Sequence, residues 1–171
     1  MALLAITVLG HDRPGIIADV TAALASREAN VEDSSMTLLQ GFFAWTLVVE
    51  TEADPKAVAS DLAFLESDEL VVSVFGVSGR SAMTGPTRPM VISVHGADRV
   101  GIVSSMAAGI AGLGGNITDL QTRLGGGLFV VVAEADFPEQ VQPEQVRESL
   151  AEVGRTVGVE VAVQPADTDV M

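Results

Sequence analysis

The sequence predicts an α+β protein made of two similar units, each with the element order βαββαβ. Two observations carry this prediction. The chain matches itself when it is shifted by 86 residues, with 14 identities over positions 6 to 43 and no gap. Within each copy, strand-like apolar runs alternate with helical stripes of apolar residues. Repetition over this length indicates a tandem duplication, which fixes the architecture before any single element is assigned.

The first copy shows its elements through changes of apolar period. A mostly apolar run ending at Gly10 predicts a buried strand, and apolar residues every four positions from Pro14 predict a helix, because proline suits a first helical turn. A Gln40-Gly41 turn predicts a hairpin. The expected elements are a strand at 3–9, a helix from Pro14 to near Asn30, strands at 31–39 and 42–50, a helix from Asp54-Pro55, and a strand at 70–77.

The second copy repeats this order. Its expected elements are a strand at 90–94, a helix with apolar residues Val103, Met106, Ile110 and Leu113, strands at 117–124 and 128–135, a helix at 143–153 and a strand at 157–163. This topology places two helices on one face of a four-stranded antiparallel sheet, the ferredoxin-like arrangement. The expected domains are 1–79 and 89–165, with a linker rich in glycine and proline at 80–88 and a C-terminal tail at 166–171.

Composition excludes several classes of function. The 171 residues are 48% hydrophobic and 19% charged, as in folded globular proteins, and include no cysteine for disulfide or thiolate chemistry. Nine basic and 23 acidic residues give a net charge of -14, which repels phosphate backbones and anionic lipids. We therefore expect no direct binding to nucleic acid and none to membranes. Residues 1–9 lack the features of a signal peptide, so we expect a cytoplasmic protein.

The loop between the first strand and first helix is the most informative segment. It reads Gly-His-Asp-Arg-Pro-Gly at 10–15 and Gly-Ala-Asp-Arg-Val-Gly at 96–101. Backbone N–H groups at a helix N-terminus suit a carboxylate, and an aspartate can accept hydrogen bonds from an ammonium group. The loop could therefore clamp a free amino acid. Alternatively, Asp12 and Asp98 could simply be helix N-caps, with Gly15 and Gly101 allowing close packing.

These residues resemble the ACT domain, a small βαββαβ module that binds amino acids and regulates metabolism. The resemblance rests on Asp-Arg-Pro-Gly-Ile-Ile followed by Ala-Asn-Val at 29–31, and on Asp-Arg-Val-Gly-Ile-Val followed by Gly-Asn-Ile at 115–117. Among tandem examples, the chain is similar to regulators of the glycine cleavage repressor type. By position, the resemblance implies ligand-binding roles for Asp12, Arg13, Gly15, Ile16 and Asn30, and for Asp98, Arg99, Gly101, Ile102 and Asn116.

The resemblance implies a small amino acid such as glycine or serine as the ligand, bound across an interface between two ACT domains. The loop residue is often asparagine in serine-binding members, whereas both copies here carry aspartate. Asn30 and Asn116 also have a structural alternative, because asparagine at a helix C-terminus tolerates the left-handed conformation. We expect a homodimer, because each unit leaves an apolar sheet edge open.

No catalytic group emerges from the remaining motifs. His11 and His95 do not occupy matching positions of the repeat, and no metal-ligand cluster accompanies them. The Gly125-Gly126-Gly127 run predicts a hairpin turn rather than a phosphate loop, and Phe43, Trp45 and Leu47 predict a buried sheet face. We expect a non-enzymatic regulator without metal or cofactor that acts on a partner protein. The alternative is an ACT module that binds no ligand and acts as an accessory repressor.

Overall fold

The computed structural model describes residues 2–77 and 85–166, and the chain divides into two compact units, Met1–Ser81 and Ala82–Met171. Unit 1 contains β1 (Ala2–His11), α1 (Ile16–Ala25), β2 (Asn30–Leu39), β3 (Phe42–Thr51), α2 (Pro55–Leu62), a short 3₁₀ helix (Ala63–Leu65) and β4 (Leu70–Val77). Unit 2 contains β5 (Thr87–Ala97), α3 (Ile102–Gly112), β6 (Asn116–Gly125), β7 (Leu128–Pro138), α4 (Pro143–Val157) and β8 (Glu160–Pro165).

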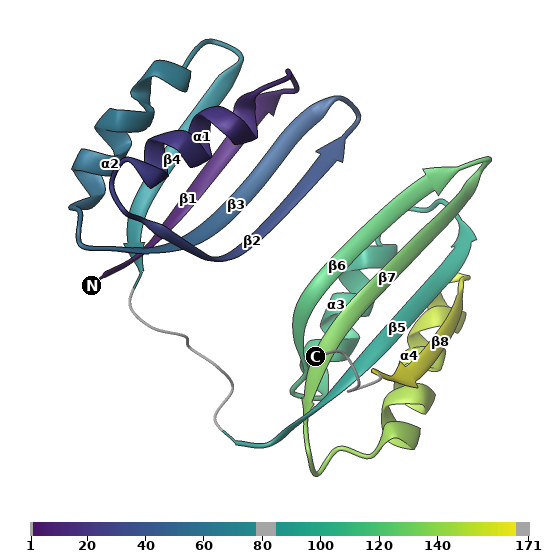
Figure 1. Ribbon diagram of the computed structural model, residues 1–171. Helices are drawn as coiled ribbons and strands as arrows, with labels where there is room; N and C mark the ends of the chain where they lie inside the picture. The colour runs from purple at the N-terminus through teal and green to yellow at the C-terminus, as the bar shows by residue number, and fades with distance from the viewer. Residues whose placement is uncertain (1, 78–84, 167–171) are drawn as a thin grey trace. The chain divides into compact units, whose positions relative to one another are not determined.

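Each unit has one four-stranded antiparallel sheet. The strand order is β2-β3-β1-β4 in unit 1 and β6-β7-β5-β8 in unit 2. Both helices of a unit cover the same face of its sheet (Figure 1). In unit 1, β1 lies in the centre of the sheet beside β4 at one edge, which leaves β2 at the opposite edge. In unit 2, β5, β8 and β6 occupy the same three places. The predicted α+β, ferredoxin-like βαββαβ fold is therefore confirmed in both copies.

The core of each unit lies between its helices and the inner face of its sheet. Alternate residues of β1 point inward, and α1 contributes residues three to four positions apart, as these two periods require. Phe43, Trp45 and Leu47 are all buried on the inner face of β3, which confirms the prediction for this strand. The buried cluster of unit 1 also includes Leu4, Ile6, Val8, Ile16, Val20 and Leu24.

Several expected boundaries differ from the structure. Pro14 lies outside α1, which begins at Ile16 and ends at Ala25 rather than near Asn30. The helix α4 extends to Val157, so the last strand starts at Glu160 instead of residue 157. Thr87 and Arg88 belong to β5, so this strand begins inside the segment expected to be a linker. Residues 80–84 of that segment, and residues 167–171 of the expected C-terminal tail, lie outside the described residues.

Two further searches cover the described part of the chain. None of its helices is long and apolar enough to cross a membrane. Within residues 2–77 and 85–166, no three or more histidine, aspartate or glutamate side chains gather as they would around a metal ion.

Candidate functional site

The strand–helix loop has the same backbone geometry in both units. Gly15 caps α1 with φ of 96°, and Gly101 caps α3 with φ of 98°. This left-handed conformation favours glycine because it places no Cβ against the backbone. Asp12 and Asp98 are therefore not the N-caps, and the N-cap interpretation of these two aspartates is wrong. The first helical N–H groups remain free of any side-chain cap.

Asp12 lies in this loop directly after the end of β1. Its backbone N–H donates to the carbonyl of Gly41 at 3.3 Å, which ties the loop to the β2–β3 hairpin. Its side chain is exposed. The Asp12 carboxylate supplies an acceptor for an ammonium group, and the uncapped helical N–H groups beside it supply donors for a carboxylate.

An open depression adjoins the loop of unit 1. Asp12, Arg13 and Gly15 form its polar rim, and apolar side chains from α1, β2 and β3 form the rest of its lining. The apolar members are Ile16, Ile17, Ala18, Met36 and Phe43. This lining brings together four of the five site residues expected in unit 1, namely Asp12, Arg13, Gly15 and Ile16. It has the mixed character of a small-molecule site, with a few polar groups above an apolar floor.

The two arginines of the repeated loops have different surroundings. The Arg13 guanidinium lies 3.4 Å from the Asp19 carboxylate in the first turn of α1, and both side chains are substantially exposed. Arg99 instead lies against Gly158, the C-cap of α4, where a Cβ would collide with its guanidinium. A cation there interacts favourably with the negative end of the helix dipole. Arg99 therefore has a structural position that Arg13 lacks.

Asn30 and Asn116 begin the edge strands β2 and β6. The left-handed residues near these positions are Glu28 and Gly114, with φ of 53° and 74°. The suggestion that the asparagines serve as left-handed helix ends is therefore wrong. The Asn30 amide nitrogen donates to the Glu32 carboxylate at 2.7 Å.

Strand register separates Asp12 from Asn30 within one unit. Asn30 pairs with Glu50, and Glu50 pairs with Leu3 on the other side of β3. Asp12 follows the end of β1, nine residues beyond Leu3. Nine strand residues span about 30 Å, so one amino acid cannot touch both side chains of the same unit. The register is equivalent in unit 2, where Asn116 aligns through Asp136 with Pro89.

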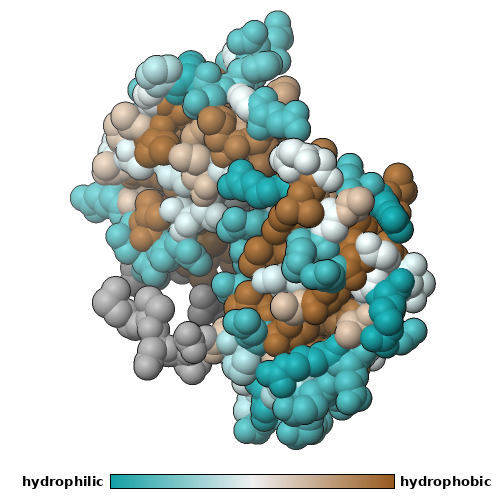
Figure 2. Space-filling view, turned by 90° about the vertical axis from the view of Figure 1, so that its right-hand side faces the viewer, coloured by the Kyte–Doolittle hydropathy of each residue, from teal (hydrophilic) through white to brown (hydrophobic). Residues whose placement is uncertain are grey.

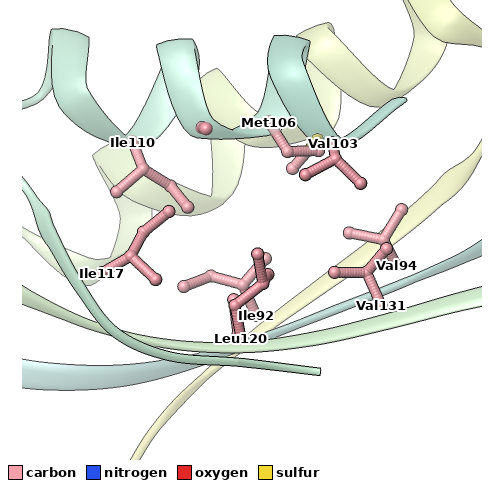
Figure 3. A pocket seen from close by; sticks show the side chains of 10 residues that line it. Ile92, Val94, Val103, Met106, Ile110, Ile117, Leu120 and Val131 are labelled. Atoms are coloured by element: carbon pink, nitrogen blue, oxygen red, sulfur yellow. The ribbon is translucent and has the colours of Figure 1, made fainter. Parts of the chain in front are cut away.

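A second hollow lies beneath α3 in unit 2, and its lining is entirely apolar (Figure 3). Val94 and Val131 line it from the sheet, and Val103, Met106 and Ile110 line it from α3. Its enclosed part has room for about one water molecule or methyl group. This hollow was missed from the sequence, although the shift of 86 residues pairs Trp45 with Val131 and Leu47 with Ala133.

The two histidines lie in different surroundings. The ring of His11 lies 4.8 Å from that of Phe42, centre to centre. The Nε2 atom of His95 lies 3.0 Å from a carboxylate oxygen of Glu160 at the surface. Gly126 and Gly127 form the turn of the β6–β7 hairpin, as predicted.

The fold and its repeated loop define a class of small βαββαβ regulatory modules. The ACT domain family matches residues 2–76 and again residues 88–164, so the chain belongs to this family as a tandem pair. A protein of unknown function from Galdieria sulphuraria has 30% identity and a TM-score of 0.82, over 96% of this chain and 98% of its own. A protein provisionally named a glycine cleavage system transcriptional repressor shares the fold, with 19% identity and a TM-score of 0.73 over 95% and 96%.

Shorter relatives match single units. A UPF0237 protein of Methanopyrus kandleri is 48% identical over 50 residues, which are 29% of this chain and 56% of that protein. A UPF0237 protein of Lactococcus lactis is 46% identical over 59 residues, which are 34% and 68%. The chain thus spans little more than half the length of the Methanopyrus relative.

Proposed function

We propose that this protein is a non-enzymatic, cytoplasmic regulator that senses a small amino acid and modulates a partner protein. The observation that carries the proposal is the repeated loop, in which an exposed aspartate stands beside a helix capped only by glycine. Glycine and serine are the first ligands to test. The name of the glycine cleavage relative supports a role in transcriptional regulation of amino-acid metabolism.

The loop offers complementary groups to the two ends of an amino acid. Free N–H groups after Gly15 would bind the ligand carboxylate, because the helix N-terminus carries partial positive charge. The Asp12 carboxylate would accept hydrogen bonds from the ammonium group. The apolar floor beside them, which includes Ile17 and Met36, leaves space for a small side chain. The loop of Asp98 and Gly101 would act in the same way.

The separation of Asp12 from Asn30 implies that a complete site needs two units. Two ACT units placed side by side in opposite directions would bring Asp12 of one unit to Asn30 of the other. The edge strand β2 is suited to such a contact, because all ten of its residues are exposed. Ligand binding would then stabilise the pairing of units, and this change would reach the partner protein. A homodimer that forms through β2 when the ligand binds is the simplest assembly that supplies these contacts.

A partner protein is needed for any effect on DNA. With nine basic residues against 23 acidic ones, the chain carries a net charge of -14 that repels a phosphate backbone. We expect no duplex shift in an electrophoretic assay with the purified protein at physiological salt. Salt-sensitive binding below micromolar concentration would contradict this part of the proposal.

Calorimetric titration of the full chain with each of the twenty amino acids tests the proposed function. We expect one small amino acid to bind, and Asp12→Asn and Asp98→Asn each to weaken that binding by about tenfold or more, as loss of a charged hydrogen bond does. Asp54→Asn is the matched control, since Asp54 caps α2 away from the loop and asparagine caps equally well. Absence of any amino-acid binding would instead favour an ACT module that acts without ligand.

A further inference from the structure

The uncovered face of the unit 1 sheet differs from that of unit 2. In each unit the helices cover only one face (Figure 1). Apolar side chains also reach the surface between polar ones in the view of Figure 2. In unit 1, five large apolar side chains of the uncovered face are at least half exposed, namely Leu9 (50%), Leu39 (55%), Phe42 (50%), Val71 (57%) and Phe75 (50%). We call this surface the open face of unit 1.

Register organises the open face into rows that run across the strands. Its central row consists of four hydroxyl residues, Ser35, Thr46, Thr7 and Ser73, each opposite the next. The rows on either side are mainly apolar, and they are Thr37, Ala44, Leu9 and Val71 on one side and Asp33, Val48, Ala5 and Phe75 on the other. Asp33 is the only charged residue in these three rows, and it lies at the β2 edge.

The same rows in unit 2 carry charge. His95 occupies the register position of Leu9, and Glu160 occupies that of Val71, where the Nε2 atom of His95 lies 3.0 Å from the Glu160 carboxylate. Arg123 replaces Thr37, and Glu134 replaces Val48. The backbone therefore tolerates charges at these positions, and unit 1 nevertheless keeps them apolar. Exposed apolar patches of this kind mark interaction surfaces.

We propose that the open face of unit 1 packs against the same face of a second copy of this chain. Two chains of charge -14 repel each other, and the centre of this face adds no charge to that repulsion. A two-fold axis through the central row would place its hydroxyls opposite one another, where they can hydrogen-bond through bridging water molecules because each both donates and accepts. Sheets pack in this way at about 10 Å separation.

The size of the face fits such a dimer. Four strands about 4.8 Å apart and about 30 Å long present on the order of 600 Å². Two copies would bury about 1,200 Å² in total, which reaches the lower end of specific protein interfaces. This contact uses none of the loop residues Asp12, Gly15 or Asn30. It therefore stands or falls independently of amino-acid binding.

Light scattering of the full chain at micromolar concentration, without added amino acids, tests the proposal. We expect wild type at twice 17.7 kDa. The double variant Leu9→His, Val71→Glu transfers the His95–Glu160 pair of unit 2 into unit 1, so the fold already accommodates these residues at this register. We expect it to raise the dimer dissociation constant by about 100-fold, as loss of central apolar contacts does.

Gln164→Glu is the matched control, because it adds a charge to the uncovered face of unit 2 and should leave the dimer intact. Circular dichroism of the double variant establishes that it is folded. A wild type of 17.7 kDa would overturn the proposal and leave the open face to another protein. A double variant that is folded and still dimeric would also overturn it, and would place the dimer contact at another surface such as β2. Neither result measures amino-acid binding, which the calorimetric titration tests separately.

Discussion

The cores of the two units fill the same space between helices and sheet with different side chains. Opposite the edge strand, unit 1 places Leu47 against Ser34, whereas unit 2 places Ala133 against Leu120. The apolar bulk has thus moved from the central strand to the edge strand. Two residues away on the same central strand, the large indole of Trp45 corresponds to the small side chain of Val131. The hollow beneath α3 remains where this exchange is incomplete.

The features that the two units share are those that the backbone requires. Gly15 and Gly101 both adopt φ values that favour glycine. Gly10 lies where a Cβ would collide with Glu69, and Gly96 lies where a Cβ would collide with Val159. The comparison teaches that a few geometric positions maintain the fold, while core volume and the uncovered face are free to diverge after duplication.

The largest expected effect comes from truncating Trp45, the large aromatic residue in the core of unit 1. Trp45→Ala should destabilise unit 1 by about 3–5 kcal/mol, because it removes a buried aromatic side chain and leaves a cavity. Val131→Ala, at the matching position beside an existing hollow, should cost unit 2 less, about 1–2 kcal/mol. Urea unfolding followed by circular dichroism measures both free energies of unfolding. Equal losses would contradict the difference in packing between the units.

The next largest effect concerns the glycine caps that the two units share. Gly15→Ala and Gly101→Ala should each cost about 1–2 kcal/mol, because alanine is strained at these positive φ values. The two losses should be similar, since the two backbone angles are similar. Gly112→Ala is the control, because Gly112 lies in α3 with open space around it. That control should be neutral or stabilising by up to about 1 kcal/mol, and thermal unfolding measures all three.

A smaller effect follows from the size of the hollow. Val131→Ile adds one methyl group beside space for about one, and should stabilise unit 2 by about 0.8 kcal/mol. Val49→Ile adds the same group in the fully buried core of unit 1, where it should give no gain or a loss through overpacking. Urea midpoints of the two variants compare them directly. A gain in unit 1 alone would show that the hollow has been placed in the wrong unit.

The smallest effect concerns an ion pair of unit 1. Hydrogen bonding from Arg27 lowers the pKa of Asp61 below its ordinary value, and the guanidinium Nη2 lies 3.0 Å from the carboxylate. A lowered pKa stabilises the fold above the ordinary value near about 4, and this contribution is lost as the pH falls through the folded-state value. Asp61→Asn should therefore slightly lower the urea midpoint at pH 7 and make no difference at strongly acid pH. A difference independent of pH would contradict this assignment.

Much of the fold was predictable because its signals are local. The repeat, the Gln40-Gly41 and Gly126-Gly127 turns and the Asp54 cap before Pro55 each indicate one element by a short-range physical rule. The start of α1 was misplaced because proline suits a first helical turn. The chain instead uses Gly15 as its cap, and Pro14 lies before it.

The candidate site was predictable in its residues but not in its arrangement. The repeated Asp-Arg-x-Gly pattern identifies the loop, and the structure shows this loop beside an open depression. The separation of Asp12 and Asn30 depends on strand register, which joins residues distant in sequence. The hollow in unit 2 depends on the combined volume of several side chains, which no single motif reports.

Backbone amide chemical shifts during an amino-acid titration test the central claim most directly, because the claim is that one small ligand contacts a loop and an asparagine from different units. We expect the amides of residues 12, 13, 15 and 16 and those of residues 30–32 to shift together, with the same saturation curve, although about 30 Å of sheet separates them within unit 1. Asp12→Asn should weaken both sets of shifts equally. Shifts confined to the loop, with Asn30 unaffected at saturation, would contradict a site formed by two units.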